Sequence, residues 1–364
     1  MLLPRVPPMT QQPSAQTFAA TPFALALDSD GDYVSPAHLR TPFRSFLVSF
    51  DRGVYWLRMP GGAGKTQFVR GIIARRTGKD GSPEGIDSAI SSGARAIAAS
   101  LTAPATPAAL VEALKAAFEA EHGLPAPEAS GASDSRDAFA GWLAALAVVA
   151  AGEGAKRLVI CIDGIEAADD LTLSFLPAAA ALPGGVVLLL TSRPAADWPP
   201  ERFAAAAERF GPGPGVVIHE IGLTDAEYVG SLRRLFVERL RPLLRSRANA
   251  LLLSLMETRA TYERGGRDAR LTADPVLRDG LKDDWKKLTN KFPRYSGQQL
   301  PVEPLAPVLD TFDTLWVDTL AKSEGRADRF FLMVRHLAAG GLAVEEVSDL
   351  PEGEALDARL STLG

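Results

Sequence analysis

The chain has 364 residues, a formal net charge of −5 and a sequence pI of about 5.6. This length suits two or three domains, and the acidic balance provides no overall basic field that would attract nucleic acid or an anionic membrane. The single cysteine, Cys161, lies in an apolar run, which excludes a disulfide framework and suits a reducing compartment. The sequence contains neither a signal peptide nor an apolar run of about eighteen residues, so we expect a cytoplasmic protein without a membrane span.

The first segment, residues 1–33, is rich in Pro, Gln, Ser and Thr over about its first 22 residues, which predicts a flexible lead-in. Ser35 and Pro36 then suit the cap and the first position of a helix, because Ser caps helices and Pro fits their first turn. Phenylalanine and leucine recur beyond them at helical spacing, so we expect a helix over 36–50.

The segment 54–70 has the order of a strand, a glycine-rich loop and a helix. The consensus of a phosphate-binding loop is G-x-x-x-x-G-K-[ST], and Gly64, Lys65 and Thr66 match its end. Met59 stands where the consensus has its first glycine. Lys65 would reach the β- and γ-phosphates of a nucleotide, and the hydroxyl of Thr66 would complete a Mg²⁺ shell. The residues that we expect to bind the nucleotide are Pro60, Gly61, Gly62, Ala63, Gly64, Lys65, Thr66 and Gln67.

The competing interpretation of this segment is a glycine-rich turn with an incidental Lys-Thr pair. The strand before the loop and the helix after it are the context that a phosphate-binding loop requires. Such a helix aims its free N–H groups at a bound anion. We therefore favour nucleotide binding.

Several elements are expected between this loop and the next buried strand. Residues 77–85 are rich in Gly, Lys and Asp and indicate a loop, whereas 94–102 fit either a short strand or a helix. A Thr-Pro pair begins a helix that we expect over 106–120. A loop rich in Pro, Ala, Gly and Ser then leads to another helix around 139–149.

Three apolar runs predict buried strands of a parallel sheet, because strands covered on both faces lose the alternation of polar and apolar residues. These runs lie at 157–163, 186–190 and 216–221. Ligands of such sheets bind beyond the carboxyl ends of the strands. Lys65, Asp163 and Arg193 all follow such ends, so we expect them to converge. The sequence therefore predicts an α/β fold of the P-loop NTPase class, with a parallel sheet flanked by helices.

The charged residues at these strand ends suit nucleotide hydrolysis. Asp163 would hold Mg²⁺ through water beside Thr66, and Glu166 would orient or deprotonate the attacking water. Arg193 would report the γ-phosphate from a neighbouring strand end. The catalytic residues would thus be Glu166, Lys65 and Arg193, and the metal ligands would be Thr66 and Asp163. The competing interpretations are a surface carboxylate for Glu166 and a structural salt bridge for Arg193.

Other polar residues of this region fit structural roles better. Asp169 and Asp170 could supply a base, but Asp170 suits the N-cap of a helix over 171–176. His219 alternates with apolar residues on its strand, which favours a structural role, and Cys161 suits packing. The sequence contains neither a His/Cys cluster with metal-ligand spacing nor a GxSxG nucleophile elbow.

From Thr224 onward the pattern changes to helices, beginning with a capping box at 224–227. Six arginines among the leucines of 233–247 indicate a solvated helix face, or else a contact to a nucleotide phosphate or a neighbouring subunit. The final residues fit either a partial winged-helix module or a plain helical bundle. Their three short helices are expected at 330–337, 343–350 and 354–363. The expected domains are the lead-in (1–33), a P-loop nucleotide-binding domain (34–222), a helical lid (223–300) and the final helical domain (301–364).

Three segments resemble the NACHT-type ATPases of the STAND class of P-loop NTPases. LVICIDGIE is similar to their Walker B strand, LLLTSRP to their sensor-one strand, and IGLTDAEYVGSLRRLF to the start of their helical lid. The resemblance covers residues 34–240 and departs from the family at two positions. Met59 replaces a glycine, and Ala167 follows Glu166 where the family often has a second acid, which favours binding over hydrolysis.

The resemblance implies a signalling switch that binds ATP or ADP with Mg²⁺ and hydrolyses ATP slowly. Such proteins are closed with ADP, form homo-oligomers with ATP once a sensor is engaged, and in prokaryotes often serve antiviral defence. The sequence identifies neither a sensor ligand nor an effector. Two other classes stay open: a scaffold that binds nucleotide without hydrolysis, and a DNA-associated ATPase of the AAA+ class. The acidic balance disfavours the latter, and we do not expect a nucleic-acid partner.

Overall fold

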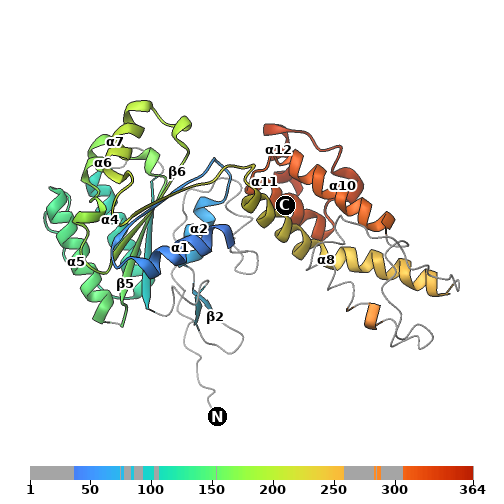
Figure 1. Cartoon of the computed structure of the whole chain (residues 1–364), viewed down its shortest axis with the longest axis horizontal. Coiled ribbons are helices and arrows are strands. Elements are labelled where there is room, and N and C mark those ends of the chain that lie inside the picture. Colours follow the sequence, from blue (N-terminus) through green and yellow to red (C-terminus); the bar gives the residue numbers. More distant parts are fainter. Residues whose placement is uncertain are drawn as a thin grey trace, which may run out of the picture.

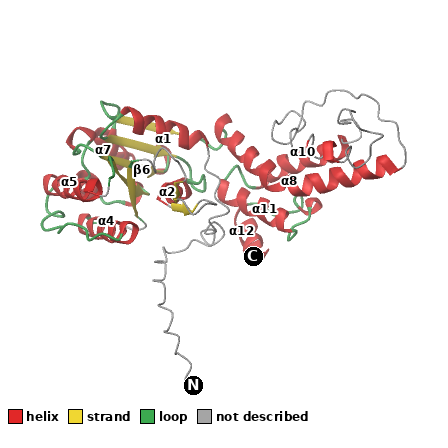
Figure 2. Cartoon of the chain, turned by 90° about the horizontal axis from the view of Figure 1, so that it is seen from below, coloured by secondary structure: helices red, strands yellow, loops and turns green. Residues whose placement is uncertain are grey.

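The computed structural model describes residues 37–73, 75–77, 83–85, 93–101, 106–152, 154–257, 283, 285–287 and 306–363. The expected lead-in and the expected Ser35-Pro36 helix start lie outside these residues. Figure 1 shows two parts beside each other, which we call the sheet part (37–220) and the helical part (226–363). In Figures 1 and 2, helix α2 lies between the sheet and the helical part.

The sheet part is built on five parallel strands. In spatial order they are β4 (Ala94–Ser100), β5 (Arg157–Asp163), β6 (Val186–Ser192), β1 (Gly53–Arg58) and β7 (Val216–Glu220). Their register aligns the carboxyl ends, with Arg58 of β1 beside Ser192 of β6 and Glu220 of β7. The three predicted strands are confirmed, and 94–102 contains a strand that pairs with β5 along its length. The chain is thus a mixed α/β protein with a parallel sheet flanked by helices, as the sequence predicted.

Each face of the sheet has its own apolar core. Tyr55 and Leu57 of β1 pack towards one face, whereas Val54 and Trp56 pack towards the other, because successive strand residues point to opposite sides. The first face carries α1 (Ala37–Ser49) and α2 (Lys65–Ile73), and the second carries α4 (Pro107–His122), α5 (Arg136–Gly152), α6 (Asp170–Phe175) and α7 (Pro200–Phe210). Cys161 is fully buried in the core of the first face, which agrees with a packing role.

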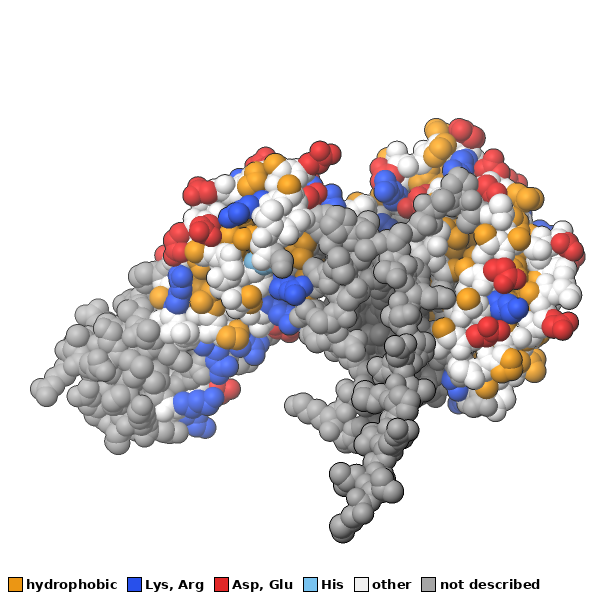
Figure 3. Space-filling view, turned by 180° about the vertical axis from the view of Figure 1, so that it is seen from behind, with side chains coloured by type: hydrophobic (Ala, Val, Ile, Leu, Met, Phe, Trp, Pro, Cys, Tyr) orange, Lys and Arg blue, Asp and Glu red, His pale blue; other side chains and the backbone are white. Residues whose placement is uncertain are grey.

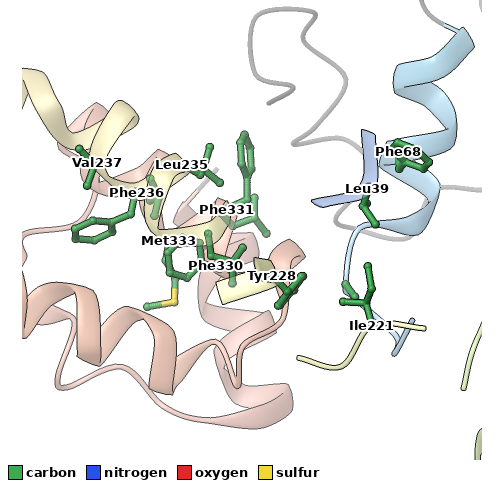
Figure 4. Close-up of a cluster of buried hydrophobic side chains, with 14 of the residues drawn as sticks. Leu39, Phe68, Ile221, Tyr228, Leu235, Phe236, Val237, Phe330, Phe331 and Met333 are labelled. Atoms are coloured by element: carbon green, nitrogen blue, oxygen red, sulfur yellow. The ribbon is translucent and has the colours of Figure 1, made fainter. Parts of the chain in front are cut away.

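The helical part contains α8 (Ala226–Glu257), α10 (Ala306–Lys322), α11 (Ala327–Ala339) and α12 (Gly353–Leu363). Phe236, Trp316 and Phe330 form its aromatic centre, with ring centroids 5.6–6.3 Å apart. The same apolar core continues onto α1 and α2, and in Figure 4 Tyr228 lies between the two groups of side chains. The two parts therefore share one core. Among the described helices, none has the length and apolarity that a membrane span requires.

Two segments differ from their expected structure. Residues 77–85 were expected as a loop, but β2 (Arg75–Thr77) and β3 (Pro83–Gly85) pair as antiparallel strands. Such short polar strands lack the apolar alternation by which strands are predicted. The expected helix at 343–350 is a 3₁₀ turn at Val344–Glu346. Glycines before that turn and a proline after it leave too few residues for a stable α-helix.

Of the predicted helix caps Thr106 and Asp170, one is confirmed and the other is wrong. Thr106 caps α4 as expected, since its Oγ1 accepts a hydrogen bond from Ala109 N at 3.3 Å. The prediction that Asp170 caps α6 is wrong. Asp169 is the cap instead, because its Oδ1 accepts a hydrogen bond from Thr172 N at 2.6 Å and Asp170 is already helical.

Two of the arginines on α8 form ion pairs within the helical part. Arg233 Nη2 lies 3.9 Å from Asp313 Oδ1, and Arg247 Nη2 lies 3.6 Å from Glu345 Oε1. Figure 3 shows basic side chains gathered along the lower edge of the helical part. These partly exposed pairs are what a solvated helix face would form.

The first prediction concerns pH and the contact between α1 and α8. His38 Nδ1 lies 2.6 Å from Ser231 Oγ, and the imidazole packs edge-on against Tyr228. Burial, with a further contribution from His219, lowers the pKa of His38 to about 4. Between the unfolded value of about 6.5 and pH 4, the unfolded chain binds a proton that the folded chain does not, so stability falls as pH falls through this window.

His38→Gln should flatten this dependence, because the substituted chain lacks that proton. The measurement is the urea midpoint at several values between pH 7 and pH 5. Burial also lowers the pKa of His219 and His336, so some slope remains in both proteins. An equally steep slope in wild type and variant would contradict the prediction.

Candidate functional site

The loop between β1 and α2 has the backbone that a phosphate-binding loop requires at its glycines. Gly62 and Gly64 have φ of 74° and 97°, a region that side chains with a Cβ rarely occupy. Met59 has a negative φ, which any residue can adopt, because Glu324 is the one non-glycine residue with a positive φ in the described chain. The Met59 side chain is instead fully buried in the core of the first sheet face. A methionine is therefore compatible with the first consensus position.

The predicted nucleotide-binding residues run through this loop into the first turn of α2. Ala63 N donates a hydrogen bond to Pro60 O at 3.3 Å, which tightens the turn, and Gly61 is exposed. The N–H groups of Lys65, Thr66 and Gln67 have no partner within their helix, because the first turn of a helix never provides one. The loop and helix start thus present donors to an anion.

Lys65 folds its side chain back over the loop. Its ammonium donates hydrogen bonds to Met59 O at 2.7 Å and to Pro60 O at 2.9 Å. Burial lowers the pKa of Lys65, while the carboxylates of Glu166 and Asp163 act in the opposite direction. The buried ammonium has only carbonyl oxygens as hydrogen-bond partners among these contacts, and an anion beside it would stabilise its charge.

Thr66 and Asp163 meet although they come from different elements. Thr66 Oγ1 donates a hydrogen bond to Asp163 Oδ2 at 2.7 Å, which joins α2 to the carboxyl end of β5. The other carboxylate oxygen, Oδ1, accepts a hydrogen bond from the hydroxyl of Thr191 on β6. The Thr191 hydroxyl also accepts from Gly164 N at 3.1 Å. Asp163 is therefore oriented from two sides.

Glu166 and Arg193 lie at the edge of this cluster. Glu166 belongs to the 3₁₀ turn Ile165–Ala167, and its Oε1 lies 3.6 Å from Arg193 Nε. Its Oε2 is buried without a hydrogen-bond partner in the described chain. Burial raises the pKa of Glu166, against the opposing effects of its own backbone hydrogen bond and of Lys65 and Arg193. The Arg193 side chain is 56% exposed, so this ion pair contributes little to stability.

The donor set at Thr66 and Asp163 fits a magnesium ion better than a transition metal. Mg²⁺ prefers oxygen ligands and takes one or two from the protein, with water and phosphate oxygens completing the shell. Among the described residues, no group of three or more His, Cys, Asp or Glu side chains could hold a metal ion. A metal ion held by Thr66 and Asp163 would have water and phosphate oxygens as its further ligands.

The structure brings together the predicted residues Lys65, Thr66, Asp163, Glu166 and Arg193. His219, in contrast, lies with its Nδ1 2.6 Å from the Tyr55 hydroxyl. Burial raises the pKa of Tyr55 and lowers that of His219, so both groups are neutral at pH 7, and the tautomer of the imidazole sets which of them donates. This pairing suits the structural role that the sequence favoured.

Sequence analysis missed three residues of the cluster. Thr191 positions Asp163, and its place directly before the Ser-Arg-Pro run was the available signal. Arg326 and Asp328, at the start of α11, lie against Gly62 of the phosphate-binding loop. No local pattern in the sequence connects them with that loop.

Comparisons with known proteins add no family assignment. No protein-family model matches the chain, and no curated protein matches it. A search of solved structures found, among others, the Hef helicase domain of Pyrococcus furiosus, with 12% identity and a TM-score of 0.26, covering 91% of this chain and 70% of that one. A likeness at this TM-score supports no argument about function, so the interpretation below depends on the residues of this chain.

The second prediction tests how Asp163 is held. Thr191→Val keeps the side-chain shape but removes the hydroxyl that joins Asp163 to Gly164, so it should lower the free energy of unfolding by about 1–3 kcal/mol. Thr319→Val is the matched control, because Thr319 is equally buried and its hydroxyl has no hydrogen-bond partner in the described chain. Urea denaturation measures both. Equal effects of the two substitutions would show that the Thr191 hydroxyl does not stabilise the site.

Proposed function

We propose that the chain is a nucleotide-dependent switch that binds ATP or ADP with Mg²⁺ and hydrolyses ATP slowly. The observation that carries the proposal is the hydrogen bond between Thr66 and Asp163, beside the buried ammonium of Lys65. A hydroxyl and a carboxylate next to a lysine, all at the carboxyl edge of a parallel sheet, suit a nucleotide polyphosphate with its metal.

Each residue has a distinct role in this proposal. Backbone N–H groups of Gly62 and of Gly64 to Gln67 bind phosphate oxygens, and Lys65 exchanges its carbonyl partners for the β- and γ-phosphates. Thr66 and Asp163 hold Mg²⁺, which when bound neutralises phosphate charge. Glu166 orients the attacking water and accepts its proton at the buried Oε2, which has no other partner in the described chain.

The switching half of the proposal follows from where Arg193 and the helical part lie. Arg193 directly follows β6, the strand that lies between β1 and β5. In this position it reports the γ-phosphate to Glu166, with which it forms an ion pair. The helical part shares a core with α1 and α2, which supports the proposal that it is a lid whose position depends on the bound nucleotide. The resemblance to STAND-class NACHT ATPases adds homo-oligomerisation with ATP, an unidentified sensor and effector, and a role such as prokaryotic antiviral defence. Its final helices would form the partial winged-helix module.

Binding without hydrolysis is the second candidate function. Glu166 is partnered by Arg193 at 3.6 Å, and its neighbour Ala167 supplies no second carboxylate. Both features weaken the case for a strong general base. ADP that stays tightly bound, with no turnover in any oligomeric state, would favour this candidate.

The third prediction addresses nucleotide binding. Lys65→Ala should abolish measurable binding of Mg-ADP and Mg-ATP, because it removes the buried cation of the loop. Isothermal titration calorimetry measures the affinity, and Lys115→Ala on α4, at the other face of the sheet, is the control that should bind as wild type does. Unchanged nucleotide affinity in Lys65→Ala would rule the proposed function out.

The fourth prediction addresses hydrolysis and its pH dependence. Glu166→Gln should lower the ATPase rate roughly 100-fold or more and leave nucleotide affinity within a few-fold of wild type. Burial raises the pKa of Glu166, so the wild-type carboxylate is protonated, and the rate lost, at a higher pH than an exposed glutamate would give. The pH–rate profile of the Glu166→Gln variant should lack this loss of rate at acidic pH. Equal rates and equal pH profiles would remove Glu166 from the catalytic role.

A further inference from the structure

The start of α11 lies directly on the phosphate-binding loop. Asp328 N donates a hydrogen bond to Gly62 O at 3.1 Å. A Cβ placed on Gly62 would lie 2.5 Å from Arg326 Nε and 2.8 Å from Asp328 Oδ1, and one on Gly64 would lie 3.9 Å from Ala327 Cβ. The helical part thus lies against both left-handed glycines of the loop, with a cation and an anion facing Gly62 and Ala327 facing Gly64.

Arg326 and Asp328 bind each other at this contact. Arg326 Nε donates to Asp328 Oδ1 at 3.2 Å and Arg326 Nη2 to Oδ2 at 2.7 Å, the two-pronged geometry that a guanidinium also forms with a phosphate. The side chains are 30% and 18% exposed, so the pair lies at an opening rather than in the core. A ligand that enters from solvent can therefore reach Arg326 and take the place of Asp328 as its partner.

The backbone that carries this pair is held in place. Tyr228 Oη donates a hydrogen bond to Gly325 O at 2.8 Å. Glu324 and Gly325 have φ of 55° and 69°, so two successive residues before Arg326 lie in the left-handed region. Arg329, which is almost fully buried, donates to both carboxylate oxygens of Asp357 on α12 at 2.8 and 3.0 Å. These contacts fix the backbone of the turn and therefore the position from which the Arg326 side chain extends.

We propose that Arg326 is a phosphate ligand supplied by the helical part, and that Asp328 is an internal anion that holds its guanidinium until phosphate arrives. The proposal deepens the function given above and depends on it. A polyphosphate on the loop repels the Asp328 carboxylate and attracts Arg326 from the same side. Arg326 then exchanges a carboxylate for phosphate oxygens, and nucleotide binding is coupled to the position of α11.

Nucleotide affinities of single variants test this exchange. Arg326→Ala should weaken binding of Mg-ADP or of Mg-ATPγS by about 10- to 100-fold, the effect of losing a hydrogen bond between charged groups. Asp328→Asn should strengthen binding several-fold, because the competing anion is gone. The affinity of Arg326→Lys should lie between those of wild type and Arg326→Ala, because lysine keeps the charge but cannot form the two-pronged contact of a guanidinium. Arg247→Ala, which removes a partly exposed ion pair elsewhere in the helical part, is the control and should bind as wild type does.

The outcomes separate this inference from the proposed function. Wild-type protein that binds neither nucleotide overturns both. Wild-type protein that binds nucleotide, with Arg326→Ala and Asp328→Asn both unchanged, overturns only the role of the pair. If Arg326→Ala fails to fold, Asp328→Asn decides alone, because misfolding does not produce a gain in affinity.

A distance measurement tests the coupling to the helical part. Val148 on α5 and Val317 on α10 are 71% and 59% exposed, so Val148→Cys and Val317→Cys accept spin labels, whereas the native Cys161 is fully buried. Saturating Mg-ATPγS should change the distance between the labels in otherwise wild-type protein and should not change it when Arg326→Ala is added. The same change in both proteins, or no change in either, would overturn the coupling.

Discussion

The hydrogen bond from Thr66 Oγ1 to Asp163 Oδ2 is the contact on which the candidate site depends. It joins two residues that are 97 positions apart in the sequence, one at the start of α2 and one at the end of β5. The strand order allows this contact because only β6 separates β1 from β5, and β6 contributes Thr191 to hold the other carboxylate oxygen. The parallel register brings the residues that follow the three strands close together, because it places all three carboxyl ends at one edge of the sheet.

The charges around this contact form an arrangement that a polyanion would complete. Lys65 is buried against carbonyl oxygens, and burial disfavours its charge. At Gly62 of the same loop, Arg326 is bound to the carboxylate of Asp328. A metal-bound polyphosphate would stabilise both the lysine and the arginine, which is the reason for proposing that the sheet part and the helical part both contribute to one binding site.

Local patterns predicted the sheet and the loop, whereas tertiary contacts decided what the sequence left open. Residues 94–102 are rich in alanine, which fits a helix or a strand, and only pairing with β5 makes Ala94–Ser100 a strand. Met59 departs from the consensus, but its side chain packs into the core, which the loop sequence alone does not reveal. Adjacent aspartates at 169 and 170 offered two caps of equal chemistry. Arg326 lies far from the loop in the sequence, so only the folding of α11 onto Gly62 identifies it.

Crystallisation of the full chain with Mg²⁺ and a non-hydrolysable ATP analogue is the most direct test of a shared polyphosphate site. We predict a metal ion beside Thr66 Oγ1 and Asp163, phosphate oxygens within hydrogen-bond distance of Lys65 Nζ, and a Lys65 side chain released from Met59 O and Pro60 O. A nucleotide bound elsewhere on the chain, with Lys65 still donating to those two carbonyls, would contradict the central claim.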